Sequence, residues 1–252
     1  MNVSIEYVAA DGVARITLNR PDKRNAITGE MMSSLREALQ RASHDSAIRI
    51  LLIRGAGKDF CAGLDLSEVL KNAENADAAF ASARRLGDLY IAMRRHPKPI
   101  IAAVQGRALG GGAGIATASD LIVATESAYF GYPEVKLGFI PAIVATMLRR
   151  AVNERQAMEL ALTGEPLSAP RAHAIGLINR VIPDAEFETA VESYASALAE
   201  QSATAMSMSK ALLYETDGLS FEASIEAGVQ ANVQARMTDD FKRGVERFLK
   251  KS

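Results

Sequence analysis

The chain has 252 residues, a hydrophobic fraction of 48% and a formal net charge of -1, which are ordinary values for a globular protein with a core of its own. Because it carries no basic excess, we do not expect nucleic acid as a partner. A single cysteine, Cys61, excludes an internal disulfide, no apolar run reaches the roughly 20 residues that cross a bilayer, and the first residues lack a signal-peptide pattern, so we expect a cytoplasmic protein with no membrane partner.

The N-terminal half predicts strands that alternate with helices. Two β-prone runs, residues 5–8 and Val13–Leu18, flank Ala10-Asp11-Gly12 and predict a hairpin. Thr28 is the predicted N-cap of a helix whose apolar residues recur up to residue 42, and a second helix is expected over residues 77–95. Largely apolar runs predict buried strands over residues 48–55, Ile100–Val104 and 121–124.

The last third of the chain has a different pattern. Helical periodicity with only short breaks covers residues 186–200, Ala203–Glu215, Phe221–Arg236 and 239–251. The whole pattern predicts an α/β fold with a covered sheet, in which residues 1–185 form the core domain and residues 186–252 form a C-terminal helical region.

A glycine cluster, Gly110 to Gly112 with Gly114, directly precedes a predicted helix. It lacks the register of a dinucleotide-binding fingerprint, and the Gly55-Ala56-Gly57-Lys58 segment lacks that of a P-loop. The histidines show no zinc-site spacing, so we expect them to be structural and expect no metal. Two interpretations of the cluster remain open: an anion site of backbone N–H groups at a helix N-terminus, or close packing of the helix against the sheet.

Several segments in order resemble the signature segments of the enoyl-CoA hydratase/isomerase (crotonase) superfamily. They are RPDKRNAI (20–27), DFCAGLDL (59–66), KPIIAAVQGRALGGGAGIATASDLIVA (98–124), YFGYPEVKLGFIP (129–141), LTGEPLSAPRAHAIGLINRVIP (162–183) and DDFKRGVERFLKK (239–251). The resemblance covers nearly the whole chain. It implies a spiral of ββα turns with a C-terminal helical trimerisation region, assembled as a homotrimer or hexamer.

The resemblance also implies an enzyme that acts on acyl-CoA thioesters, with coenzyme A as part of the substrate and no separate cofactor. Members of the superfamily stabilise an enolate-like thioester oxygen with two backbone N–H groups, which match Leu64 and Gly111 here. By the same resemblance, Glu134 in the Phe130-to-Glu134 segment is the catalytic carboxylate. A preorganised donor of this kind contributes about 2.7–4 kcal/mol in the transition state.

The other glutamate that hydratases of this superfamily use is replaced by Gly114. Hydration of a 2-enoyl-CoA remains our leading prediction, since one glutamate can take a proton from water and return it. A 3-enoyl to 2-enoyl-CoA isomerase, which needs one carboxylate, and a non-catalytic acyl-CoA-binding protein stay open as alternatives. Asp65 or Glu68 could supply a second group, although Asp65 after a glycine turn is more typical of a helix cap.

Substrate-binding residues are predicted for both parts of the thioester. The coenzyme A phosphates favour cations, for which Lys23 and Arg24 are the first candidates, followed by Lys58, Lys250 and Lys251. Around the thioester and the acyl group, the predicted contacts are Ala62, Gly110, Tyr132, Pro133 and Pro141, with Phe60, Leu86, Tyr90, Ile140 and Ile143 as further candidates.

Overall fold

The computed structural model describes residues 3–250, and its N-terminal element is the predicted hairpin. Strands β1 (Ile5–Ala10) and β2 (Val13–Leu18) pair antiparallel, with Ile5 opposite Leu18. Asp11 and Gly12 join them with positive φ angles of 53° and 78°. Two central residues with positive φ give the turn type whose twist matches that of the flanking strands.

The larger sheet has six strands in the order β1-β2-β3-β4-β6-β9. All pairs after the hairpin are parallel. Residues on both faces of the central strands are buried, which explains the apolar runs of residues 50–53 and Ile100–Val104. The added strands are β3 (Ile50–Gly55), β4 (Ile100–Val104), β6 (Leu121–Thr125) and β9 (Arg180–Ile182).

A second sheet of three short strands lies beside the first. It consists of β5 (Arg107–Leu109), β7 (Tyr129–Gly131) and β8 (Leu167–Ser168), and an isolated bridge between Cys61 and Ala108 continues it. These strands are too short to show a period of two, so the sequence did not predict them. Together with the flanking elements they form consecutive ββα turns: β4, β5 and the next helix, then β6, β7 and the next α-helix.

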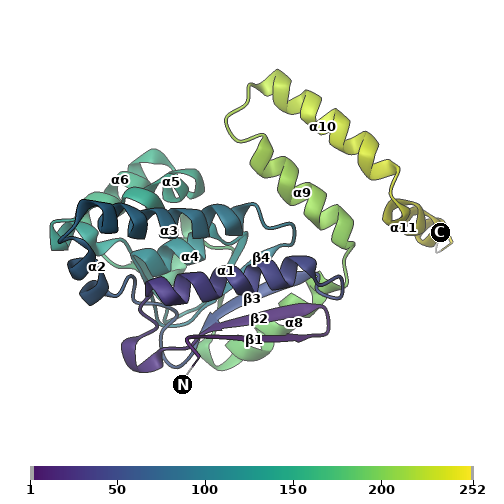
Figure 1. Ribbon diagram of the computed structural model, residues 1–252. Coiled ribbons are helices and arrows are strands. Elements are labelled where there is room, and N and C mark those ends of the chain that lie inside the picture. Colours follow the sequence, from purple (N-terminus) through teal and green to yellow (C-terminus); the bar gives the residue numbers. More distant parts are fainter. Residues whose placement is uncertain (1–2, 251–252) are drawn as a thin grey trace.

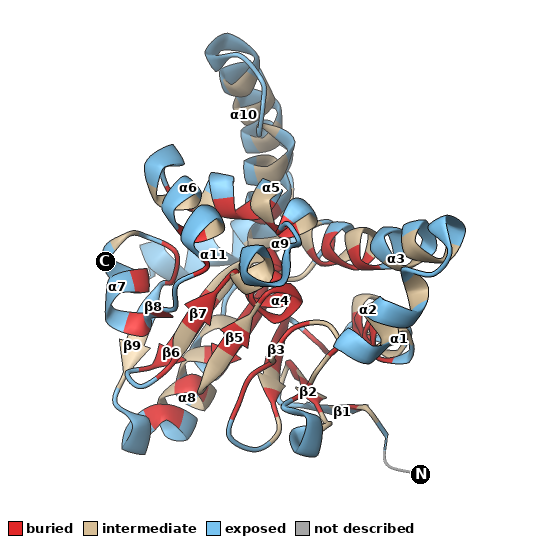
Figure 2. Cartoon of the chain, turned by 90° about the vertical axis from the view of Figure 1, so that its left-hand side faces the viewer, coloured by how far each residue is buried: buried red, intermediate tan, exposed pale blue. Residues whose placement is uncertain are grey.

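Helices cover both faces of the larger sheet (Figure 2). On one face lie α1 (Gly29–His44), α3 (Ala76–Arg94) and α4 (Gly111–Ala118), whose buried residues join the main core. Thr28 Oγ1 accepts a hydrogen bond from Met31 N at 3.2 Å, which confirms the predicted N-cap of α1. The remaining helices of the core region are α2 (Leu66–Asn72), α5 (Ala142–Ala151), α6 (Glu154–Thr163) and α7 (Ala169–Ala174), with 3-10 turns η1 (Pro21–Lys23), η2 (Pro133–Leu137) and η3 (Asp184–Glu186).

The C-terminal helices divide into one that covers the sheet and three that leave it. Helix α8 (Phe187–Ala199) packs Phe187, Val191 and Ala195 against the second face of the sheet. Helices α9 (Ala203–Glu215), α10 (Phe221–Arg236) and α11 (Asp239–Leu249) extend away as an arm (Figure 1). The predicted boundary between residues 185 and 186 therefore lies before α8, a helix that belongs to the core. Helical periodicity reveals that a helix has an apolar face, but not which surface that face covers.

Within residues 3–250, no helix combines the length and the apolar character that crossing a bilayer requires.

Candidate active site

Asn25 joins two loops beside the small sheet. It is fully buried, and its side-chain amide donates to Ala56 O at 2.9 Å and to Asp59 O at 2.8 Å. Its Oδ1 accepts from Arg20 N at 2.9 Å. A buried polar side chain with all these bonds fixes the segment of residues 20–28 against the loop of residues 56–65. Asn25 lies in the RPDKRNAI segment, but the sequence alone indicated no role for it.

The loop of residues 61–65 runs beside this segment and leaves one backbone donor free. Gly63 O accepts from Ile27 N at 2.8 Å, and Asp65 N donates to Ile27 O at 2.8 Å. These two bonds form a parallel bridge between Ile27 and Leu64, in which the Leu64 N–H points to the other side. The Leu64 N–H has no acceptor among residues 3–250.

The glycine cluster builds the N-terminus of α4. Gly110 has φ 49° and ψ -120°, a conformation open only to glycine, and its N–H donates to Gly131 O of β7 at 2.9 Å. Gly111 is the first residue of the helix, and its N–H has no acceptor within the described part of the chain. The positive end of the α4 dipole adds to this free donor, so the position favours a partial negative charge.

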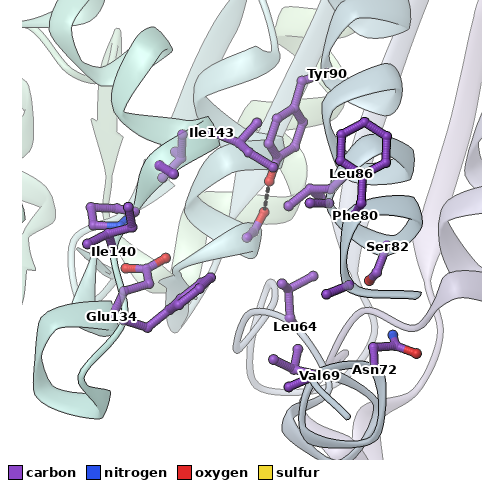
Figure 3. A pocket seen from close by; sticks show the side chains of 18 residues that line it. Leu64, Val69, Asn72, Phe80, Ser82, Leu86, Tyr90, Glu134, Ile140 and Ile143 are labelled. Atoms are coloured by element: carbon purple, nitrogen blue, oxygen red, sulfur yellow. Dashed lines mark hydrogen bonds between the residues drawn. The ribbon is translucent and has the colours of Figure 1, made fainter. Parts of the chain in front are cut away.

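The two free donors belong to loops that meet. A Cβ placed on Gly63 would lie 3.8 Å from Gly111 N, and a Cβ placed on Gly111 would lie 3.3 Å from Leu64 Cγ. Leu64 and Gly111 line the same cavity, whose volume is about 410 Å³ (Figure 3). The arrangement can hold one oxygen atom between two backbone N–H groups, the geometry of an oxyanion hole.

Glu134 reaches the same cavity from η2 (Figure 3). Its Oε1 lies 3.0 Å from the position that a Cβ on Gly110 would take, and its Oε2 is buried with no hydrogen-bond partner among residues 3–250. Burial raises the pKa of the Glu134 carboxyl above its ordinary value, an effect that a hydrogen bond from its own backbone opposes. A carboxylate in such a place accepts a proton more readily than a solvated one.

No second carboxylate stands in the wall of the cavity, as far as residues 3–250 define it. Asp65 caps α2 by accepting from Ser67 N at 3.2 Å and pairs with Arg20 at 3.1 Å, as its position after a glycine turn predicted. The hydrogen bond from Ser67, then that from Arg20, keeps the pKa of Asp65 low despite partial burial. Glu68 Oε2 accepts from Gly29 N at 2.8 Å.

The rest of the cavity wall is mostly apolar, with Asn72 and Ser82 as polar members. Four of the predicted site residues line it: Leu64, Gly111, Glu134 and Pro141. The further candidates Leu86, Tyr90, Ile140 and Ile143 also line it, and Ala142 and Val144 complete the segment after Pro141. Helices α2 and α3 add a wall that the sequence did not predict, because residues at helical spacing give no sign of which cavity they face. Its members are Val69, Asn72, Ala79, Phe80, Ser82 and Ala83.

The other predicted contacts lie outside this wall. Tyr132 is fully buried, with its hydroxyl 3.2 Å from Thr117 Oγ1, and Phe60 is buried in the core. Ala62 N donates to Arg24 O at 2.9 Å, and Ala62 and Pro133 are half-buried beside the lining residues Leu64 and Glu134. A role for these residues in substrate binding stays a prediction.

The cations predicted for coenzyme A lie on the surface. Lys23 and Arg24 at the end of η1 and Lys58 in the next loop are exposed, and none makes an ion pair with another residue in the range 3–250. Lys250 follows α11 at the far end of the arm, and Lys251 lies outside the described residues.

Cys61 and His96 are structural side chains. Cys61 Sγ donates to Asn25 O at 3.1 Å, and burial raises the pKa of its thiol to about 12. The His96 ring nitrogens contact Lys98 O and Leu39 O away from the cavity. Within the part of the chain that the structure describes, no group of histidine, cysteine and carboxylate side chains is arranged to hold a metal ion.

Comparison with known proteins gives consistent matches over the whole length. The family profile described as enoyl-CoA hydratase/isomerase matches residues 9–252. A Thermus thermophilus protein whose curated name places it among the enoyl-CoA hydratases is 38% identical over 95% of both chains. The 1,2-epoxyphenylacetyl-CoA isomerase of Escherichia coli is 36% identical over 95% of this chain and 93% of its own. The crystal structure of an enoyl-CoA hydratase from Mycobacterium smegmatis superposes with a TM-score of 0.95 at 30% identity, covering 99% of this chain and 97% of that one.

Proposed function

The chain belongs to the enoyl-CoA hydratase/isomerase family and has its crotonase fold, and we propose that it adds water to the double bond of a 2-enoyl-CoA thioester with Glu134 as its single carboxylate. As a member of this family it is an enzyme that acts on acyl-CoA thioesters. One observation carries the finer proposal: two free backbone donors and one buried carboxylate open into the same apolar cavity.

In the proposed reaction the thioester oxygen accepts hydrogen bonds from the N–H groups of Leu64 and Gly111. These bonds strengthen as negative charge develops on that oxygen, which lowers the barrier. Glu134 removes a proton from the attacking water as the water oxygen bonds to C3, and it then delivers a proton to C2. Each turnover restores the Glu134 carboxylate, and no cofactor is needed besides the coenzyme A of the substrate.

Isomerisation of a 3-enoyl-CoA to a 2-enoyl-CoA is the second candidate. It is favoured by the single carboxylate of the cavity wall, since Glu134 alone can remove the C2 proton and return one at C4. The curated name of the Escherichia coli relative also describes an isomerase of a coenzyme A thioester.

Lys23, Arg24 and Lys58 are the proposed contacts of the coenzyme A phosphates. All are exposed on loops next to the Leu64 loop, and their charges are not neutralised by ion pairs with described residues. Phosphate groups of a bound thioester would complete such pairs.

The arm supports a proposal about assembly. Its helices expose large apolar side chains, among them Phe221 at 77% and Ile225 and Val233 at 54% exposure. An apolar surface of this kind marks an interface, and we propose that the chain forms a homotrimer or a pair of trimers through it.

The experiment follows absorbance of the conjugated thioester with crotonyl-CoA and, separately, with a 3-enoyl-CoA. Loss of the 2-enoyl signal marks hydration, and its gain marks isomerisation. Glu134→Gln should lower kcat by about 10²–10⁴-fold, the usual contribution of a general acid–base. Wild-type protein that binds acyl-CoA thioesters but turns over neither substrate, nor branched and aromatic ones, would instead be a non-catalytic binder.

A further inference from the structure

Tyr90 of α3 directs its hydroxyl group at the glycine segment of residues 110–112. Its side chain is 3% exposed and lines the cavity, and its Oη donates a hydrogen bond to Gly111 O at 2.8 Å, drawn as the dashed line in Figure 3. The acceptor belongs to the residue whose N–H faces the thioester in the proposed reaction. The hydroxyl is thus committed to the backbone of the oxyanion hole.

This backbone needs an anchor. Gly110, Gly111 and Gly112 follow one another without a Cβ, so side-chain sterics restrict their φ and ψ angles little. An oxyanion hole depends on donors that are oriented before the reaction begins. Tyr90 belongs to a 19-residue helix, and its hydrogen bond fixes the carbonyl of Gly111. This carbonyl is part of the peptide between Gly111 and Gly112, which directly follows the peptide that carries the Gly111 N–H.

Tyr90 also occupies the space beside Gly114. A Cβ on residue 114 would lie 2.1 Å from Tyr90 Oη and 2.5 Å from Tyr90 Cζ, both far inside van der Waals contact. Position 114 is where hydratases that resemble this chain carry their other glutamate. The phenol and the glycine are therefore sterically matched: neither a carboxylate nor an alanine fits at position 114 while Tyr90 keeps its place.

We propose that Tyr90 is a positioning residue that holds the peptide between Gly111 and Gly112, and through it the backbone that carries the Gly111 N–H, for thioester polarisation and, by filling the space next to Gly114, keeps the site to a single carboxylate. The inference rests on the proposed function, because it assumes that the Gly111 N–H binds the thioester oxygen. In this role Tyr90 acts on the backbone that binds the thioester and does not itself react with the substrate.

The kinetic test compares Tyr90→Phe with Tyr214→Phe. Both variants lose a tyrosine hydroxyl that donates at 2.8 Å, but the partner of Tyr214 is Asp120, away from the cavity. Tyr90→Phe should lower kcat about 10-fold with KM changed less than about twofold, because the lost bond orients a donor that acts in the transition state. Tyr214→Phe should leave kcat unchanged. Equal kcat for Tyr90→Phe and wild type would overturn the positioning role.

A spectroscopic test separates this inference from the proposed function. The absorbance of bound 4-dimethylaminocinnamoyl-CoA shifts to longer wavelength when its thioester carbonyl is polarised. Wild-type protein should show the shift, and Tyr90→Phe should show a smaller one. Absence of the shift from the wild type contradicts the proposed oxyanion hole itself, whereas equal shifts in both proteins contradict only the role of Tyr90.

Two further variants keep the inference testable if Tyr90→Phe folds poorly. Tyr90→4-aminophenylalanine retains an N–H donor at the same place and should restore most of the kcat and the shift. Gly114→Ala should lower the Tm in the wild type and leave it unchanged or raise it in Tyr90→Ala, because alanine is the better helix former once the phenol is gone. The same decrease in both backgrounds would show that Tyr90 does not restrict position 114.

Discussion

Glu134 is partly buried and its Oε2 has no hydrogen-bond partner in the described part of the chain, and both features make its ionised form less favourable in the folded protein. A solvated glutamate would be a weaker base at neutral pH, and a fully buried one would not ionise. The half-buried carboxyl at the cavity wall lies between these limits, as a residue that must both take and return a proton requires.

The pH dependence of turnover follows from this environment. The base must be ionised, and burial raises its pKa above the ordinary value of a glutamate, so kcat/KM should begin to fall with decreasing pH at a higher pH than an ordinary glutamate would give. Initial rates measured with crotonyl-CoA between pH 4 and pH 9 test this. An acidic limb at or below the ordinary glutamate pKa would contradict the raised value.

The stability of Glu134→Gln should depend on pH in a defined direction. Because the folded-state pKa exceeds the unfolded one, the wild type loses stability as pH rises through the interval between them, and the amide variant does not. Glu134→Gln should therefore have a higher Tm than wild type at pH 7, with a difference that shrinks below the unfolded pKa. Thermal unfolding at both pH values measures it; a lower Tm of the variant at pH 7 would count against burial as the cause.

Asn25→Ala should both destabilise the protein and slow the reaction. It removes the bonds to Ala56 O and Asp59 O and places an alanine at φ 56°, so we expect a loss of about 2–3 kcal/mol in urea unfolding. Loss of these bonds should also lower kcat, because the loop that carries the Leu64 N–H would no longer be held in place. Asn19→Ala, which loses exposed bonds only, is the control and should cost less than about 0.5 kcal/mol. Equal effects of the two would show that Asn25 does not hold the loops.

At the scale of elements, one buried polar cluster attaches α9 to the sheet. Lys210 Nζ donates to Asp120 Oδ2 at 2.7 Å and to Met93 O at 3.1 Å, and Tyr214 Oη donates to Asp120 Oδ1 at 2.8 Å. Burial lowers the pKa of Lys210, and Asp120 opposes this effect. The C-terminal half of α9 is thus fixed to the core by charge pairing that depends on every member being present.

Lys210→Ala should lower the free energy of unfolding by about 3 kcal/mol, because it leaves the largely buried Asp120 without its cation. The double variant Lys210→Met with Asp120→Asn should lose less, since it removes both charges. Lys242→Ala, at an exposed ion pair of the arm, is the matched control and should change stability by less than about 0.5 kcal/mol. Urea unfolding at one protein concentration compares all three; a single variant as stable as the double one would argue against the pairing.

At the scale of the whole molecule, the chain has a closed core and an open arm. The core covers both faces of its sheet, and Lys210 and Tyr214 tie α9 to it, whereas α10 has no buried residue (Figure 1). On α10, Ile225, Val229 and Val233 recur every four residues and so share one exposed face. A second copy of the chain would bury this face.

Light scattering after size-exclusion chromatography should give the mass of a trimer or hexamer for the wild type. Val229→Asp places a charge in the middle of the apolar face and should shift the mass toward the monomer. Gln230→Asp, the exposed neighbour on the next face, should leave the assembly intact. A monomeric wild type at micromolar concentration would contradict the proposed assembly.

The sequence by itself determined what depends on near neighbours and on pattern. The sequence predicted the hairpin, the caps at Thr28 and Asp65, and the buried central strands. A cap joins residues only two or three apart, and a buried strand is recognised by its apolar composition. The family resemblance pointed to Leu64, Gly111 and Glu134. Only the tertiary structure decided that these residues share one cavity, since their loops are distant in the chain.

The tertiary structure also decided which of the C-terminal helices pack against the sheet, since their apolar faces have the same periodicity. Helix α8 and the arm show the same helical pattern, yet α8 covers the sheet and the arm stays open, because an apolar stripe does not specify the surface that it packs against. The match of Tyr90 with Gly114 was hidden for the same reason. A glycine in a sequence gives no sign of which distant side chain uses the space that it leaves.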